Sequence, residues 1–151
     1  AVAVSPLMWM KSSPRKQQVM VFRKKARSLA INVSMRRQPD ALDSEKRLEA
    51  IYYGLSWQKE ILSESWILHR RNKRGWESHF DGWRWISNEA DLVWHELLSA
   101  TVENLPFGVT AIVASKEGIG VIWDERGDDD LFENLHQSLI GLRKKGEEIC
   151  T

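Results

Sequence analysis

One stretch of this sequence restricts the fold more than any other. Residues 108–123, GVTAIVASKEGIGVIW, place apolar side chains at alternate positions, break at the polar tetrapeptide SKEG (115–118), and then resume the alternation. A period of two is that of a β-strand, and a short polar break between two such runs predicts a tight turn. The stretch therefore predicts a β-hairpin, so the fold contains an antiparallel sheet.

Other short patterns predict further strands. Residues 18–24 and 28–36 also alternate, so we expect a second hairpin that turns at the basic residues KKAR (24–27). Residues 70–74, RRNKR, are expected to form a charged loop. The remaining strands are expected at two short runs, 65–70 (SWILHR) and 83–87 (WRWIS).

Three segments have the apolar spacing of helices, and each begins at a residue type that caps helices. Proline stops the second helix, and glycine is expected to end the third. The expected helices and their apolar faces are 40–55, begun by Asp40 or Asp43, with Leu48, Ile51, Tyr52 and Leu55; 88–105, begun by Asn88 or Asp91, with Trp94, Leu97 and Leu98 before Pro106; and 128–146, begun by Asp128 to Asp130, with Leu131, Phe132, Leu135, Leu139 and Leu142 before Gly146.

The order of these elements predicts the fold class. It runs ββ-α-β(β)-α-ββ-α, which favours an α+β fold with an antiparallel β-sheet built of hairpins and helices packed on one face. A length of 151 residues fits one domain, so we expect 1–151 to be a single domain. The chain starts AVAVSPLMW, without methionine, so we expect a processed protein or a domain excised from a longer one.

Residue usage excludes several classes of protein. Cys150 is the single cysteine, so no disulfide framework and no Cys/His metal site can be built, and we expect a reducing intracellular setting. No run approaches 18 apolar residues, so we expect no membrane segment. No phosphate loop, nucleophile elbow or HExxH motif occurs, and the nearby Glu77 and His79 are a chance pair more often than an acid and base. We therefore expect no catalytic residue, no metal and no cofactor.

Positive charge is concentrated near the N-terminus. Residues 1–39 hold nine Lys/Arg and no Asp or Glu, whereas residues 40–151 hold 13 basic and 21 acidic residues, a net charge of −8. A transit peptide is one interpretation, because such segments are basic and poor in acids. The alternation in QVMVFRK and LAINVS is typical of strands instead, so we favour a basic face that meets phosphates.

Eight tryptophans are the other unusual feature of the composition. Most should lie in the core, because each buries a large apolar area. One or two surplus rings beside positive charge would suit a nucleotide, with a ring stacked on the base and Lys or Arg on the phosphates. A methylated guanine, as in an mRNA cap, is itself a cation and gains a cation–π contribution of about 0.5–2 kcal/mol.

Residues 76–98 resemble the cap-binding translation initiation factor. The resemblance lies in Trp76-Glu77, then GWRWI (82–86), then a helix with Leu97-Leu98. In that family a Trp-Glu pair grips methylguanine and a nearby Gly-Arg-Trp strand supplies an arginine for the phosphates. The resemblance implies an alternative site formed by Trp76, Glu77 and Arg84, although the loop is shorter here and the N-terminal third lacks that family's spaced tryptophans.

A second resemblance runs along nearly the whole chain, to the cap-binding domain in the second basic polymerase subunit of orthomyxoviruses, and of thogotoviruses more than influenza. Residues 66–84 are an insertion relative to influenza. Five collinear segments carry the resemblance: FRKKARSLAINVSMRR (22–37), similar to the family's basic hairpin; EAIYYGLSWQKE (49–60), similar to its next helix; HELL (95–98); FGVTAIVASKEGIGVIWDE (107–125); and SLIGLRKKGEE (138–148).

This second resemblance implies its own set of binding residues. Trp57 corresponds to the inner stacking aromatic and Trp9 to the outer one, with a core role as the alternative for Trp57. Lys24 corresponds to a lysine that helps to read the guanine, and His95 to a histidine near the cap phosphates. The family reads the guanine donor edge with a glutamate in a region that holds no acid here. Unpaired N–H groups cost about 1–3 kcal/mol, so we expect weak or absent binding of an isolated cap analogue.

Three hypotheses follow for the function. The first is a cap-binding or degenerate cap-binding-like domain of a viral RNA polymerase, which holds capped RNA in the host nucleus and virion, contacts other polymerase subunits and is monomeric when isolated. The second is a divergent cellular cap-binding protein of the initiation-factor type. The third is a structural module of a large assembly, whose basic N-terminal region docks on RNA or on an acidic partner.

Overall fold

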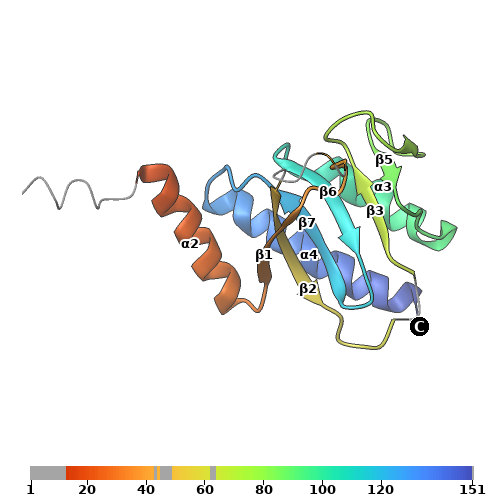
Figure 1. The fold of residues 1–151 in the computed structure, drawn as a ribbon. Coiled ribbons are helices and arrows are strands. Elements are labelled where there is room, and N and C mark those ends of the chain that lie inside the picture. Colours follow the sequence, from red (N-terminus) through yellow and green to blue (C-terminus); the bar gives the residue numbers. More distant parts are fainter. Residues whose placement is uncertain (1–12, 43, 45–48, 62–63, 151) are drawn as a thin grey trace, which may run out of the picture.

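A computed structural model describes residues 13–42, 44, 49–61 and 64–150 of the chain. The predicted stacking residue Trp9 lies outside these ranges. The described residues form a seven-stranded antiparallel sheet with three α-helices and one 3-10 helix (Figure 1). The prediction of an α+β fold with an antiparallel sheet is therefore confirmed.

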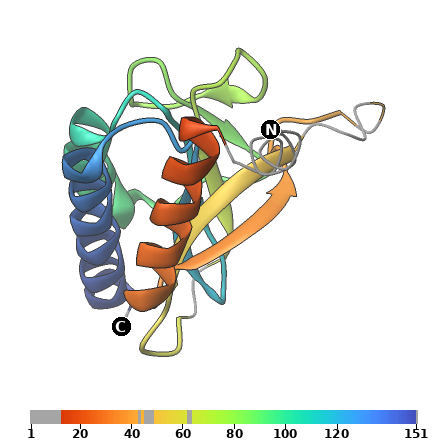
Figure 2. The same ribbon diagram turned by 90° about the vertical axis from the view of Figure 1, so that its left-hand side faces the viewer.

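The strands pair in the spatial order β1-β2-β7-β6-β3-β5-β4. Their bounds are β1 Asn32–Arg37, β2 Glu49–Ser56, β3 Trp66–His69, β4 Trp76–Glu77, β5 Arg84–Ile86, β6 Val109–Ala114 and β7 Gly118–Trp123. The helices are α2 Pro14–Ser28, the 3-10 helix η1 Leu92–Trp94, α3 His95–Asn104 and α4 Asp129–Ile149. Helices α2 and α4 lie side by side on one face of the sheet (Figure 2).

The hairpin predicted from residues 108–123 lies in the middle of the sheet as β6 and β7, and it is confirmed. Its turn is closed by a hydrogen bond from the Ser115 N–H to the Gly118 carbonyl, at 2.9 Å. The glycines of β7 allow strand β2 to approach closely, because a Cβ at Gly118 would lie 2.2 Å from the Leu55 carbonyl oxygen. The sequence GIG thus serves strand pairing.

The predicted hairpin over 18–36 is wrong in its first half, because residues 14–28 form helix α2. The Ser13 hydroxyl accepts a hydrogen bond from the Lys16 N–H at 3.2 Å, and proline is favourable directly after such a cap. Phe22 and Ala26, four residues apart, are fully buried on one side of the helix. Burial at that spacing outweighs the strand-like alternation of QVMVF. Only 32–37 forms a strand, and its partner is β2.

The helix predicted at 40–55 is also wrong, because residues 49–56 form the inner strand β2. Tyr52 and Tyr53 are consecutive and both are buried, so they point to opposite faces of the sheet. Tyr53 packs on the helix side against Trp123, whereas Tyr52 belongs to a small cluster with Ala50 and Ile122. A strand buried on both faces reads as a continuous apolar run, which periodicity alone does not distinguish from a helix.

The helix predicted at 88–105 is confirmed only in its later part, because residues 88–91 are not helical and α3 begins at His95, after the 3-10 helix η1. The other predicted elements are confirmed. Strands β3 and β5 lie at 66–69 and 84–86, and the charged loop separates β3 from the short strand β4. Helix α4 begins at the cap Asp128, whose carboxylate accepts the Leu131 N–H at 2.9 Å. It continues past Gly146, which we expected at its end, because that glycine faces the Trp94 ring; a Cβ there would lie 2.6 Å from the ring.

Most described tryptophans form the core, as expected. The buried rings are Trp66, Trp83, Trp85, Trp94 and Trp123. Trp66 contacts the rings of Trp85 and Trp94 edge to face, at centroid distances of 5.9 and 5.3 Å. Trp57 is partly buried and Trp76 is 41% exposed. Within the described ranges, no helix is both long and apolar enough to cross a membrane.

Candidate functional site

The loop RRNKR (70–74) is held in place by one buried carboxylate. The Asp40 side chain is 1% exposed, and its Oδ2 accepts hydrogen bonds from Arg71 and Asn72. Arg74 donates to the Asp40 carbonyl oxygen at 2.7 Å. Three of the five side chains in the loop are therefore used to fix its conformation. Lys73 lies between them and forms no hydrogen bond or ion pair within the described part of the chain.

Arg70, the first residue of the loop, is fixed by the segment before β6. Its Nε donates to the Val109 carbonyl at 2.8 Å, and Nη2 donates to the Pro106 carbonyl at 2.6 Å. The guanidinium stacks over the Trp83 ring, 4.7 Å from its centroid. Burial lowers the pKa of Arg70 from its ordinary value, but a guanidinium remains charged at neutral pH. The structure thus places a rigid cation above an aromatic ring.

Strands β4 and β5 place Glu77 directly opposite Arg84. Gly75 precedes β4 with a φ of +88°, and a Cβ there would lie 2.0 Å from the Trp85 carbonyl oxygen. The Gly75 carbonyl accepts a hydrogen bond from Arg84 Nη2 at 2.8 Å. Arg84 Nε is buried and has no hydrogen-bond partner among the described residues. One donor of this arginine therefore remains unused.

These side chains surround a cavity of about 620 Å³ between the loop and the β4–β5 pair. Its described lining is Arg70, Asn72, Lys73, Glu77, Ser78, Phe80, Asp81, Gly82, Trp83 and Arg84. Glu77, like Lys73, forms no hydrogen bond or ion pair within the described ranges. The cavity therefore offers a free carboxylate and a free ammonium group, and the Arg84 side chain adds a positive charge to its lining. Such a set can bind a ligand that has both donor groups and negative charge.

The loop between β4 and β5 supports one wall of this cavity. The Ser78 hydroxyl donates to the Trp83 carbonyl at 2.6 Å and accepts from the Phe80 N–H at 3.1 Å. Gly82 turns the chain with a φ of +81°. Phe80 and Trp83 line the cavity but are only 6% and 4% exposed. A base in the cavity would therefore contact little of either ring.

Trp76 and Glu77, which the initiation-factor resemblance pairs, point to opposite sides of β4. Successive residues of a strand do so, and Trp76 does not line the cavity. Its indole Nε1 donates to Glu89 Oε2 at 2.8 Å. The structure thus brings Glu77 and Arg84 together around one cavity, whereas Trp76 lies outside that cavity.

Trp57, the predicted inner stacking residue, lies directly after β2. Its Nε1 donates to the Ser115 carbonyl at 2.7 Å, and its ring lies 6.3 Å from that of Trp94. Gly146 of α4 also faces it, because a Cβ there would lie 3.1 Å from the indole. These contacts tie Trp57 to the core and to the β6–β7 turn.

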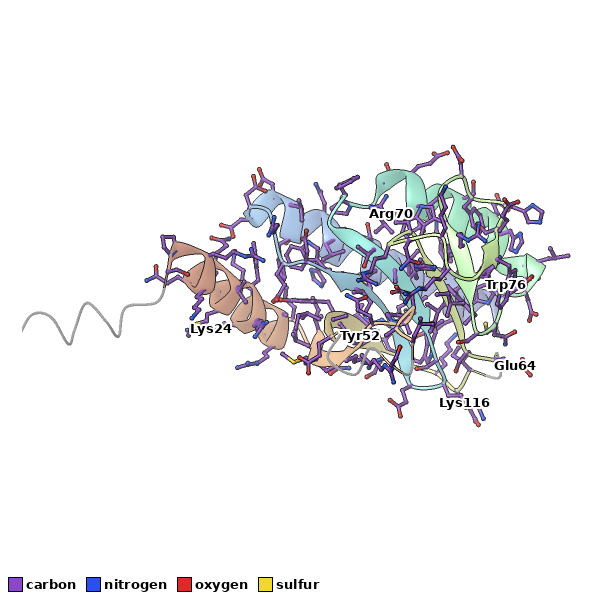
Figure 3. The ribbon with its side chains drawn as sticks, turned by 45° about the horizontal axis from the view of Figure 1, so that its top comes forward. Lys24, Tyr52, Glu64, Arg70, Trp76 and Lys116 are labelled. Atoms are coloured by element: carbon purple, nitrogen blue, oxygen red, sulfur yellow. The ribbon has the colours of Figure 1, made fainter. Side chains whose placement is uncertain are left out.

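Lys24 and His95 are placed on different elements from Trp57. Lys24 is exposed on α2, at the opposite end of the molecule from Trp76 (Figure 3). His95 is the first residue of α3, and its ring lies 5.3 Å from that of His79 and 5.5 Å from that of Phe80. Helices α2 and α3 lie at opposite ends of the sheet (Figure 1). The structure therefore does not bring Lys24 and His95 into one site.

Sequence reasoning missed two members of this cavity, Lys73 and Trp83. Both stood in stretches that we singled out, RRNKR and GWRW, but nothing in the local pattern showed that the two stretches face one another. The partner that orients the loop, Asp40, lies more than 30 positions away and was interpreted as a helix cap. The described part of the chain holds no group of three or more His, Cys, Asp or Glu side chains that could bind a metal ion.

Comparison of the chain with protein-family models, with curated proteins and with solved structures found no match.

Proposed function

We propose that this chain is a non-catalytic RNA-binding domain that receives the guanine nucleotide of a capped RNA end in the cavity between the 70–74 loop and β4–β5. The observation that carries the proposal is the set of unused polar groups around that cavity. Glu77 and Lys73 have no partner within the described residues, and the charged side chain of Arg84 stands with them in the lining. They line the same cavity of about 620 Å³.

The carboxylate of Glu77 is the group that would recognise the base. Guanine presents an N–H and an amino group along one edge, and a carboxylate accepts both. Adenine has no equivalent pair of donors on that edge, so Glu77 favours guanine. Glu77 would thus take the place of the guanine-reading glutamate that the resemblance to the orthomyxovirus domain implies and that residues 1–39 lack.

The cations of the cavity would meet the phosphates. Lys73 lies on the loop that Asp40 fixes, and Arg84 lies across from Glu77 on the neighbouring strand. Phosphate oxygens accept charge-assisted hydrogen bonds from both types of side chain. Because Phe80 and Trp83 are nearly buried, stacking contributes little. We therefore expect weak binding, with a clear preference for guanine and a small preference for the 7-methylated base.

The proposal includes a viral polymerase as the source of the domain, with the host nucleus and virion as its location and other polymerase subunits as neighbours. Two of the five segments that resemble the orthomyxovirus domain do not have the expected structure, because 22–37 is not a hairpin and 49–60 is not a helix. Three segments keep the expected elements: HELL (95–98) in α3, 107–125 in the β6–β7 hairpin and 138–148 in α4. This part of the proposal rests on sequence segments alone.

Titration of the chain with 7-methyl-GTP, GTP and ATP, followed by tryptophan fluorescence, tests the nucleotide site. We expect both guanine nucleotides to bind more tightly than ATP. Glu77→Gln should reduce the preference for guanine roughly tenfold, because a guanine donor loses its partner. Lys73→Ala should weaken binding of GTP more than that of guanosine. Lys116→Ala, in the β6–β7 turn, removes an equally exposed charge and should change neither.

Two tryptophan variants separate this site from the two sites implied by resemblance. Trp76→Ala and Trp57→Ala should both leave the affinity for GTP and 7-methyl-GTP within about twofold, since neither ring lines the cavity. Loss of binding in Trp57→Ala alone would place the base at Trp57 and overturn the assignment made here. Equal affinity for GTP and ATP would contradict the proposed guanine site.

A further inference from the structure

The cations of helix α2 divide into two sets that differ in their partners. One set is bonded to the rest of the molecule. Arg23 forms a bidentate ion pair with Glu125, with both N–O distances at 2.8 Å, and Lys25 pairs with Asp129 at 2.8 Å. Arg15 donates to the Asp124 carbonyl at 2.9 Å. These three side chains fasten α2 to the end of β7 and the start of α4.

The second set, Lys16, Lys24 and Arg27, has no such use. All three are exposed, and none forms a side-chain hydrogen bond or an ion pair within the described part of the chain. At 100° per residue they lie within an arc of about 80°, and they span about 16 Å along the helix. Met20, which is 63% exposed, lies within the same arc. We call Lys16, Met20, Lys24 and Arg27 the outer stripe.

The outer stripe points away from the layer that α2 shares with α4. Phe22 and Ala26 on the opposite side of the helix are fully buried, and Phe22 stacks 5.5 Å from Phe132 of α4. Lys24 lies on the exposed side of α2, far from Arg70 and Trp76 (Figure 3). The stripe is therefore separate from the cavity. Nothing on α2 itself neutralises it, because the helix contains no Asp or Glu.

We propose that the outer stripe is a second RNA contact, which binds the phosphate backbone of the RNA body while the cavity receives the end nucleotide. This inference rests on the proposed function, since it assumes that the partner is RNA. Three cations along one open helix face complement a chain of regularly spaced phosphates. Contacts to phosphates carry no sequence information, so the contact is independent of sequence. The stripe thus adds affinity without selectivity.

Two features favour RNA over an acidic protein as the occupant. Protein interfaces have a well-packed apolar centre, whereas the outer stripe offers a single methionine among charges. Lysine and arginine side chains on an exposed helix reach a flexible phosphate chain without a matching surface. An acidic protein is the competing occupant, and the experiment includes it.

The test compares the full chain with the variant K16A/K24A/R27A in binding an uncapped 12-nucleotide RNA, measured by fluorescence anisotropy over a series of salt concentrations. Each phosphate contact on a single strand contributes about 0.7 to the slope of log K against log salt, so the slope should fall by about 2. The affinity at low salt should fall on the order of tenfold or more. The control K59A/K116A/K144A removes the same charge from exposed lysines elsewhere and should leave the slope unchanged.

Failure of this inference can be told apart from failure of the nucleotide site. The variant K16A/K24A/R27A should bind GTP like the unaltered chain, because no stripe residue lines the cavity. An unchanged salt slope in the variant would overturn the stripe, whatever the GTP result. Loss of binding to poly-glutamate with unchanged RNA binding would also overturn it and identify an acidic protein as the occupant. Urea unfolding of the variant confirms that it is folded.

Discussion

Helix α2 and the 70–74 loop are the two strongly basic regions of the molecule, and they use their charge differently. In the loop, Arg70, Arg71 and Arg74 bond to the protein and leave Lys73 free. In α2 the cations Arg15, Arg23 and Lys25 are bonded to the rest of the molecule, and the free ones form the outer stripe. A cluster of cations in a sequence is therefore not a measure of binding surface. The cations available to a ligand are those that remain after the others have bonded to carboxylates and carbonyls of the protein.

Each region depends on one buried carboxylate, and removing those carboxylates is the strongest test of the comparison. Glu125 is 4% exposed and accepts hydrogen bonds from Arg23 and from the Tyr53 hydroxyl, the latter at 2.7 Å. Glu125→Ala leaves the partly exposed Arg23 cation and the buried Tyr53 hydroxyl without a partner. We expect the free energy of unfolding in urea to fall by about 2–4 kcal/mol, because one charged and one neutral hydrogen bond are lost.

Glu103→Ala, an exposed carboxylate on α3, is the control and should change stability by less than about 0.5 kcal/mol. The affinity of the folded Glu125→Ala protein for GTP should be unchanged. A loss of stability no larger than that of the control would show that Arg23 and Glu125 do not hold α2 in place.

Asp40 plays the corresponding part for the loop, and its removal should affect both stability and binding. Asp40→Ala takes away the acceptor of Arg71 and Asn72. We expect a loss of about 1.5–3 kcal/mol in the free energy of unfolding, because the bonds involve a charged group. Unlike Glu125→Ala, this variant should also bind GTP more weakly, since Lys73 loses its fixed position. Unchanged GTP affinity in a destabilised Asp40→Ala would show that the loop does not form the site.

Alkaline pH tests the α2 anchor without removing a charge from it. Burial, followed by the hydrogen bond to Glu125, raises the pKa of Tyr53 above its ordinary value of 10.0. The folded protein therefore keeps the proton that the unfolded chain releases above that pH. The contribution of Tyr53 to the free energy of unfolding is fully present below pH 10. Above pH 10 it should decline, by at most about 1.4 kcal/mol per pH unit.

Urea titrations at several pH values between 9 and 11 measure this decline. Tyr53→Phe should flatten it without abolishing it, because burial also raises the pKa of Tyr52. An identical slope in Tyr53→Phe would assign the whole effect to other groups.

One free lysine from each region, Lys24 and Lys73, gives the smallest expected effect on stability and the clearest contrast in binding. Lys24→Ala and Lys73→Ala should each change the free energy of unfolding by less than about 0.5 kcal/mol. Lys73→Ala should weaken GTP binding, whereas Lys24→Ala should weaken only the binding of longer RNA. The same response in both variants would mean that the two regions form one continuous surface.

The two regions also show what could be predicted from the sequence. The β6–β7 hairpin and α4 were predicted because each has one clear period, two in 108–123 and about 3.6 from Leu131 to Leu142. Strand β2 was missed because Tyr52 and Tyr53 are buried on opposite faces, which removes the alternation. Helix α2 was missed because VMVF imitates a strand, although the cap Ser13 and the pair Phe22 and Ala26 were visible.

The site was only partly predictable for a related reason. Glu77 and Arg84 were named through the resemblance to the initiation factor, and their pairing across β4 and β5 needs only a short turn. The bond from Asp40 to Arg71 joins residues 31 positions apart, and the pair of Arg23 and Glu125 joins residues 102 apart. No local sequence pattern predicts a contact between residues so far apart in the chain. It becomes visible only when the sheet has placed β1, β3 and β7.

The distance in sequence between α2 and its anchors has a consequence during synthesis. Chains grow at about 5–20 residues per second, so Glu125 and Asp129 are made roughly 5–20 seconds after Arg23 and Lys25. During that interval Arg23 and Lys25, two of the six cations of α2, have no carboxylate partner. Until Glu125 and Asp129 are made, these two side chains are available to surrounding polyanions such as ribosomal RNA. The two ion pairs that fasten α2 therefore form only after nearly all of the described sequence has been synthesised.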